Sequence, residues 1–261
     1  MKKKGNLSDI VGNCLIGFDA EWTKNYKITN GNVPFCFSVI TVGDQELSFS
    51  KLNKGNIKFK YIQYYCENRE DFKELVMLAD FWFEKILKAL DNSVLCGHQV
   101  SSDFSVLYNI GSANAIDSLI HIERMRQEWR KRKENNPVHI MDTRYDIVQT
   151  FLGKSRRLVD MCNDFELDVT QPELKKSSMT KLQNIFFETK DEDIYERISV
   201  MNLRHSLCAI VLYWLNRKIN NAEQRKPINI NKSVYNCLKS DFNWVASKEF
   251  SVLLKEGGLY D

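Results

Sequence analysis

The chain has 261 residues, of which 43% are hydrophobic, and its 37 Lys and Arg residues nearly balance its 34 Asp and Glu residues. This length and composition allow a buried core in one large or two small domains, so we expect a soluble globular protein. The formal charge of +3 is too small to indicate a polyanionic partner, so any basic surface has to be local.

Two further patterns exclude classes of protein. No uninterrupted apolar stretch approaches the roughly 20 residues that span a bilayer, and the lysines at 2–4 are not followed by the apolar core of a signal peptide. The seven cysteines are scattered, mostly within apolar runs, and form no Cys-x-x-Cys pair, which argues against a zinc site. We therefore expect an intracellular, cytoplasmic protein without a membrane segment.

The first part of the chain predicts strands followed by a helix. Residues 14–20 form an apolar run typical of a strand, and residues 34–42 and 45–50 are placed as the two arms of a hairpin. Residues 51–70 are polar and aromatic by turns, which indicates a connection. Apolar residues then recur at helical spacing from 72 to 90, so a helix should cover the sheet.

The second part of the chain predicts strands that alternate with helices. A strand at 93–96 leads through a glycine turn into a helix at 102–107, and a further short strand lies at 138–141. Helical patterns dominate the remainder, most clearly at 194–219. The order of elements is therefore β-β-β-α-β-α-β-α-α, and residues 227–232 are the best candidate for a linker.

Two carboxylates stand one residue apart at the end of the first predicted strand, in the pentapeptide FDAEW. Because residues i and i+2 of a strand point to the same side, Asp19 and Glu21 can face one hard cation and bind it through oxygen. The alternative is an exposed acidic strand end, which is the commoner meaning of an isolated Asp-x-Glu. The downstream sequence bears on this choice.

A further carboxylate, Asp103, follows an apolar strand and a glycine turn at the start of the next helix. At such a position a carboxylate is either a helix cap, worth about 1 kcal/mol, or a metal ligand. Alone, Asp103 would more often be a cap, but together with Asp19 and Glu21 on the same predicted sheet it is better explained as a ligand. His98 is expected to hydrogen-bond within the turn rather than to bind metal.

These motifs together resemble the DEDD (DnaQ-like) superfamily of 3'-5' exonucleases. FDAEW looks like the first motif, residues 97–104 look like the second, and Asp142 with Thr143 is similar to a pair often seen in the family outside its metal ligands. The resemblance covers about residues 12–220. It implies an α/β fold, a ribonuclease H-like mixed five-stranded sheet flanked by helices, with residues 221–261 as a small C-terminal appendage or cap.

The helix expected to carry the third motif departs from the family pattern. In the family this helix supplies a fourth metal-binding Asp, preceded by a general-base Tyr or His four or five residues earlier. Residues 202–215 have the expected apolar rhythm and contain His205, but no Asp or Glu. Counting from His205 puts the missing carboxylate at Ala209 or Ile210, and aligning the apolar residues puts it at Cys208.

Two explanations of the missing carboxylate stay open. In the first, the natural protein has lost this ligand, has little catalytic activity, and binds nucleic acid or recruits a partner. In the second, an Asp of the natural protein has been replaced, for example by Ala at 209. If the second explanation holds, restoring Asp at 209, or at 210 if that fails, should raise metal-dependent nuclease activity.

For an active site, the resemblance implies phosphodiester hydrolysis with two Mg²⁺ or Mn²⁺ ions. Asp19 would bridge the two ions, Glu21 would hold the first, and Asp103 would support the second. His205 would take the proton from the attacking water, a task that suits an imidazole with a pKa near its ordinary value of about 6.5.

Two kinds of residue are candidates for binding nucleic acid. Trp22 and Phe104 flank the acidic motifs and can stack on terminal bases, although apolar neighbours of strand ends more often belong to the core. Basic residues lie in a predicted helix at 121–133 and in a stretch at 175–181, where a grip on the phosphate backbone and a solvated charged surface are both open. The basic candidates are Arg130, Lys131, Arg132, Lys175 and Lys176.

Three functions from different classes therefore remain. The sequence favours a 3'-5' exonuclease acting on single-stranded 3' ends of DNA or RNA. A catalytically degenerate relative that binds nucleic acid or recruits a partner is the second, and an unrelated α/β enzyme or interaction domain is the third. The choice between DNA and RNA, and the presence of a protein partner or an oligomer, stay open at this point.

Overall fold

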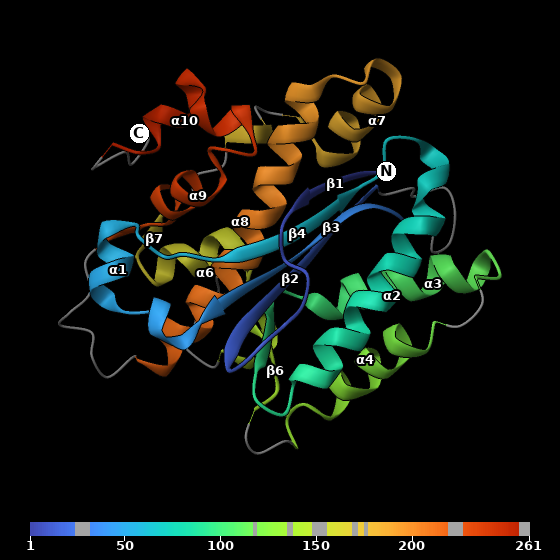
Figure 1. Ribbon diagram of the computed structural model, residues 1–261, viewed down its shortest axis with the longest axis horizontal. Coiled ribbons are helices and arrows are strands. Elements are labelled where there is room, and N and C mark those ends of the chain that lie inside the picture. The colour runs from blue at the N-terminus through green and yellow to red at the C-terminus, as the bar shows by residue number, and fades with distance from the viewer. Residues whose placement is uncertain are drawn as a thin grey trace.

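The computed structural model describes residues 1–23, 32–116, 119–134, 138–147, 156–168, 172–174, 177–218 and 227–255. Within these residues the chain forms a six-stranded mixed sheet with helices on both faces (Figure 1). In spatial order the strands are β1 (Lys2–Gly5), β4 (Lys60–Tyr65), β3 (Val33–Gly43), β2 (Cys14–Thr23), β5 (Val94–Gly97) and β6 (Ile140–Asp142). The first four pair with one another in antiparallel fashion. β5 then pairs in parallel with β2, and β6 pairs in parallel with β5. The predicted α/β class is confirmed.

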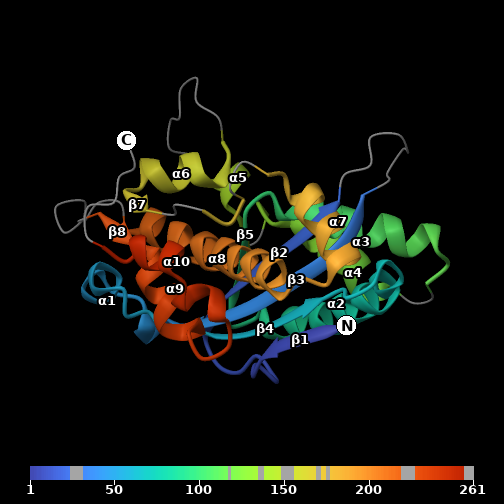
Figure 2. The ribbon, with the colours of Figure 1, turned by 90° about the horizontal axis from the view of Figure 1, so that it is seen from above.

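The two faces of the sheet are covered by different helices. α2 (Phe72–Ala89) and α3 (Val100–Ala113) pack on one face, with α4 (Ile120–Lys131) behind them. α8 (Glu192–Arg217) crosses the opposite face over β2, β3 and β5 (Figure 2). The predicted helices at 72–90 and 194–219 are therefore confirmed, and the sheet lies between two helical layers.

α8 is almost entirely enclosed by the rest of the fold. Among the described residues it is the one helix whose length and composition would allow it to cross a membrane, yet 94% of its most apolar window is buried inside the protein. Its apolar residues contact the sheet, α6 (Leu158–Asp164), α7 (Met179–Thr189) and α9 (Ile230–Leu238). Packing in the core accounts for the apolar character of this helix.

The C-terminal residues 227–255 pack on α8 and share its core. The strands β7 (Leu167–Asp168) and β8 (Ile228–Asn229) pair in parallel, and α9 begins directly after β8. The prediction of a linker at 227–232 is therefore wrong, because these residues form a strand and the start of a helix. The shorter helices are α1 (Phe49–Lys54), α5 (Thr143–Asp146) and α10 (Lys248–Val252), with 3-10 turns at Asp44–Glu46, Arg69–Asp71, Pro172–Leu174 and Asn243–Ala246.

The predicted hairpin arm at 45–50 is also wrong. A 3-10 turn and α1 occupy this region, since the Ser48 hydroxyl accepts a hydrogen bond from the Lys51 N–H at 3.2 Å and Gly55 ends the helix with a φ of 65°. The place of the third predicted strand is taken by β4, which lies inside residues 51–70, the segment that we expected to be a connection. Residues 2–5 then add the edge strand β1 beside β4, so the sheet has six strands rather than five.

Candidate metal centre

The acidic pair lies on the face of the sheet that α8 covers. Side chains alternate along β2, so Asp19 and Glu21 point toward α8 while Phe18 points to the opposite face. α8 approaches β2 closely because Gly17 has no side chain: a Cβ there would lie 2.6 Å from the Ser206 carbonyl oxygen. The register between β2 and β3 shifts just after Glu21, at the outer end of the site.

α8 places His205 and Asn202 against this pair. His205 Nδ1 lies 3.2 Å from Glu21 Oε1 and 3.5 Å from Asp19 Oδ2. Asn202 Nδ2 donates to Asp19 Oδ2 at 2.7 Å and to the Asp19 carbonyl oxygen at 3.0 Å. Gln63 Nε2 donates to Asn202 Oδ1 at 3.1 Å and thereby holds the amide in place. The Asp19 carboxylate is fixed by a network that joins β2, β4 and α8.

The site gathers negative charge in a largely buried place. The side chains of Asp19 and Glu21 are 13% and 15% exposed, and that of His205 is 19% exposed. Burial lowers the pKa of His205, but its contacts with the two carboxylates more than offset this and raise the pKa to about 10. Burial raises the pKa of Glu21, and the bond from His205 opposes that rise. The protonated imidazole therefore balances part of the charge of the pair.

Asp103 brings a further carboxylate from α3. It lies in the first turn of that helix and is 3% exposed. Burial, followed by the charges of Asp19 and Glu21, raises the pKa of Asp103 well above its ordinary value, and a hydrogen bond from the Ala20 backbone N–H opposes this rise. The cap residue of α3 is Gln99, so Asp103 is not the helix cap. Asp103 thus lies where the charges of Asp19 and Glu21 act on it, while the ligand atoms that lie within 4.8 Å of one another among the described residues belong to Asp19, Glu21 and His205.

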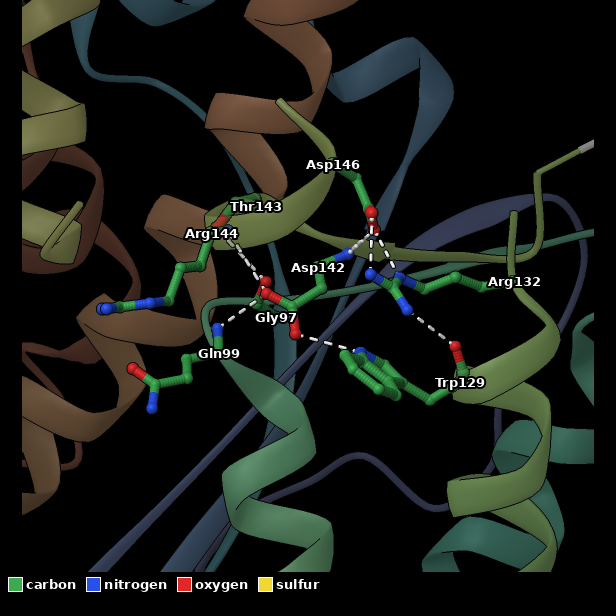
Figure 3. Close-up of polar contacts among 8 residues, drawn as sticks. All are labelled: Gly97, Gln99, Trp129, Arg132, Asp142, Thr143, Arg144 and Asp146. Carbon is green, nitrogen blue, oxygen red and sulfur yellow. Dashed lines mark hydrogen bonds and ion pairs between the residues drawn. The ribbon is translucent and has the colours of Figure 1, made fainter. Parts of the chain in front are cut away.

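A hydrogen-bond network around Asp142 fixes the start of α3 and hence the position of Asp103 (Figure 3). Asp142 Oδ1 accepts from the Gln99 backbone N–H at 2.8 Å, and Oδ2 accepts from Trp129 Nε1 at 3.0 Å. Gln99 has a left-handed φ of 57°, which is costly for a residue with a side chain, so this bond helps to hold it there. Asp142 orders the turn, in line with its expected place outside the metal ligands.

His98 has the structural role that the sequence predicted. Its Nδ1 lies 2.9 Å from Thr143 Oγ1, and this hydroxyl also donates to the Gly97 carbonyl oxygen at 3.2 Å. Burial, and after it the charge of His205, lowers the pKa of His98 to about 4. His98 is therefore a neutral imidazole near pH 7 that ties β5 to the start of α5.

Arg132 is not available to grip a phosphate backbone, so that prediction is wrong. Its guanidinium donates to both carboxylate oxygens of Asp146 at 2.7 and 2.9 Å, and the residue is only 7% exposed (Figure 3). Its neighbours Arg130 and Lys131 are exposed and remain candidates. Lys175 and Lys176 lie outside the described residues.

Phe104 is equally unavailable to stack on a base. It is fully buried, and its ring contacts Phe18 and Phe83 at centroid distances of 6.0 and 5.2 Å. The prediction failed because Phe104 follows Asp103 by one helical position and therefore points into the core. Trp22, in contrast, is partly exposed at the end of β2, beside Glu21.

The predicted position of the fourth ligand is wrong. α8 runs antiparallel to β2, because Asn202 meets Asp19 and the later residue Ser206 meets Gly17. Residues 208–210 therefore lie farther along, away from Glu21. They are buried in the core, with Cys208 at 0%, Ala209 at 1% and Ile210 at 0% exposure. The helix positions that face the acidic pair are Asn202 and His205.

The donor set fits a divalent cation. One ligand atom from each of Asp19, Glu21 and His205 lies within 4.8 Å of the others. Glu21 Oε1 is buried and lies 3.2 Å from His205 Nδ1, so these two atoms can face one cation. Sequence reasoning missed Asn202, since an amide three positions before a histidine in an apolar helix carries no local sign of contact with Asp19.

A groove of about 320 Å³ lies between α3 and α4. It combines serine hydroxyl groups from α3 with the guanidinium groups of Arg126 and Arg130 from α4. Such a surface suits the phosphates of a polyanion, because cations and hydroxyl donors contact phosphate oxygens without regard to base sequence. The complete lining is Ser101, Ser102, Phe104, Ser105, Arg126, Trp129 and Arg130.

Comparison with known proteins gives this chain no relative: no family model matches it, and no curated protein matches its sequence significantly.

Proposed function

We propose that this chain is a metal-dependent 3'-5' exonuclease that hydrolyses phosphodiester bonds at the ends of DNA or RNA. The observation that carries this proposal is the convergence of Asp19 and Glu21 from β2 with His205 from α8, within reach of the charge of Asp103 from α3. Clustered buried carboxylates repel one another, so such a cluster is best explained by a cation that neutralises it.

The architecture supports the same proposal. We propose a ribonuclease H-like fold, in which β2, β3 and β4 are the antiparallel strands and β5 and β6 the parallel ones, with α8 as the helix of the third motif. The acidic residues then lie on the central strand and on α3, and the histidine lies on α8. On this proposal β1 is an addition at the edge of the family's five-stranded sheet.

The residues of the centre divide the work of binding and orientation. Asp19, Glu21 and Asp103 would hold two Mg²⁺ or Mn²⁺ ions, which supply a hydroxide from bound water and stabilise the departing 3' oxygen. Asn202 keeps one oxygen of Asp19 in place by its hydrogen bond at 2.7 Å. The Asp142 network holds α3 so that Asp103 stays opposite the pair. Preorganised carboxylates of this kind need little rearrangement when substrate binds.

Contacts with nucleic acid would come from the groove and from Trp22. Arg126 and Arg130 can neutralise backbone phosphates, and the partly exposed indole of Trp22 can stack on a terminal base. These contacts read no base edges, so we expect binding with little sequence preference.

We also propose that the enzyme acts in the cytoplasm. The seven cysteines, which all lie among the described residues, are free, and six of them are buried in the fold. Proteins that function in oxidising compartments commonly use cysteines as disulfides, whereas buried free thiols suit a reducing environment.

The test compares the protein with its Asp19→Asn variant on 5'-labelled single strands of DNA and RNA, with Mn²⁺ or with a chelator. Shortening from the 3' end that requires Mn²⁺ and is lost in Asp19→Asn is the expected result. Asp9→Asn is the matched control, because Asp9 is an exposed carboxylate, paired with Lys85, far from α8. Binding without shortening would make the chain a nucleic-acid-binding protein, and shortening that survives in Asp19→Asn would overturn the assignment of the site.

A further inference from the structure

His205 stands at ligand spacing from both members of the acidic pair. Two atoms that share one cation at about 2.1 Å, at neighbouring corners of an octahedron, lie about 3 Å apart. His205 Nδ1 lies 3.2 Å from Glu21 Oε1 and 3.5 Å from Asp19 Oδ2, close to that value. Modest adjustment of the side chains would let one ion contact all of them.

The same geometry argues against a general base at this position. A base accepts its proton from a water that lies about 2.6–3.2 Å away, so that water would stand between the imidazole and the metal ligands. Here Nδ1 lies directly against the carboxylate oxygens. These distances leave no room for a water between the imidazole and the carboxylates.

The contact between Glu21 and His205 shows where a cation would lie. Glu21 Oε1 is buried, and His205 Nδ1 lies 3.2 Å from it. A nitrogen that binds a metal has to give up its proton, so the proton between these two atoms would leave as the ion enters. A metal ion held jointly by Glu21 and His205 would take its place.

We propose that His205 is a nitrogen ligand of the metal centre in place of the missing fourth carboxylate, and that the centre therefore selects Mn²⁺ over Mg²⁺. Mg²⁺ strongly favours oxygen ligands, whereas Mn²⁺ accepts imidazole nitrogen together with carboxylate oxygen. Exchanging a carboxylate for an imidazole also removes one negative charge, which weakens the hold on Mg²⁺ most. This inference deepens the proposed function, on which its catalytic meaning rests.

The decisive measurements are of metal binding, without substrate. Calorimetric titration of the metal-free protein with MgCl₂ and with MnCl₂ gives the ratio of the two dissociation constants. Electron paramagnetic resonance of the Mn²⁺ complex reports a ligating nitrogen through its hyperfine coupling. We expect nitrogen coupling in the native protein, and in His205→Asp a loss of that coupling with at least about a tenfold fall in preference for Mn²⁺ over Mg²⁺, because the centre becomes all oxygen.

His139→Gln is the matched control, since His139 bonds the Leu90 carbonyl oxygen at 2.6 Å and should leave the coupling unchanged. If His205→Asp does not fold, His205→Gln offers an oxygen in the same place and should likewise lose the coupling. Bound Mn²⁺ without nitrogen coupling, or an unchanged metal preference in the folded variant, would overturn the ligand role. Mn²⁺ held by His205 in a protein that shortens no nucleic acid would support this inference while the proposed exonuclease fails.

Discussion

The two faces of β2 differ completely although their residues alternate along one strand. Phe18 belongs to an aromatic cluster with Phe37, Phe83 and Phe104, sealed by α2 and α3. One residue later, Asp19 belongs to a polar network under α8. The aromatic face gains free energy by burial, whereas the acidic face costs free energy until a cation arrives. Stability and chemistry are thus carried by neighbouring residues and can be separated by mutation.

The largest expected effect is on the aromatic face. Phe18→Ala should lower the free energy of unfolding by about 3–5 kcal/mol, because it removes a fully buried ring and leaves a cavity. Urea denaturation measures this change. Under conditions where the variant stays folded, its Mn²⁺ affinity should match that of the native protein, and a large loss of affinity would show that the two faces are coupled.

The next largest effect is expected from acid, which should lower the free energy of unfolding through the protonation of His98. The pKa of His98 is about 4 in the folded protein, below its unfolded value of about 6.5, so the unfolded chain binds more protons between these values. Stability contributed by neutral His98 is present above pH 6.5 and is lost as the pH falls toward 4, by about 3 kcal/mol. Denaturation at several pH values should show a shallower slope in His98→Gln. An identical slope in the two proteins would contradict the assignment.

Asn202→Ala should sharpen the comparison within the polar face. The change removes the amide that donates to Asp19 while Gln63 keeps its bond to the Ser199 carbonyl oxygen at 3.0 Å. We expect a loss of about 1–2 kcal/mol in Mn²⁺ binding, because Asp19 is no longer held in place. Calorimetric titration measures the loss. Equal affinity in the variant would mean that the metal orients Asp19 unaided.

The smallest effect is expected at the groove. Arg130→Ala should weaken binding of single-stranded nucleic acid by about 1 kcal/mol and reduce the salt dependence by about one phosphate contact, with no change in stability. Fluorescence anisotropy at several salt concentrations measures both. Arg124→Ala is the matched control, since Arg124 is exposed on the same helix but does not line the groove. Similar losses in both variants would indicate a diffuse charge effect.

Local patterns were sufficient for much of the fold. The apolar runs of β2 and β5 and the helical spacing of α2 and α8 predicted these elements, and alternation along a strand placed Asp19 and Glu21 on one side. The pattern failed at 45–50, where the cap residue Ser48 and the left-handed Gly55 favour a short helix over a hairpin arm. It failed again at β4, because the mixture of polar and aromatic residues in this segment predicted a connection rather than a strand.

The sequence by itself determined which residues can hold a metal, because strand alternation and the start of a helix fix where carboxylates point. Only the tertiary structure decided what faces them. Asn202 and Asp19 are 183 positions apart in the sequence, and their contact depends on how α8 is rotated over β2. The close approach of the two elements at Gly17 sets this rotation. α8 is buried on nearly all sides and has no apolar stripe, so its periodicity does not show which side faces β2, and only packing could select His205 rather than residues 208–210.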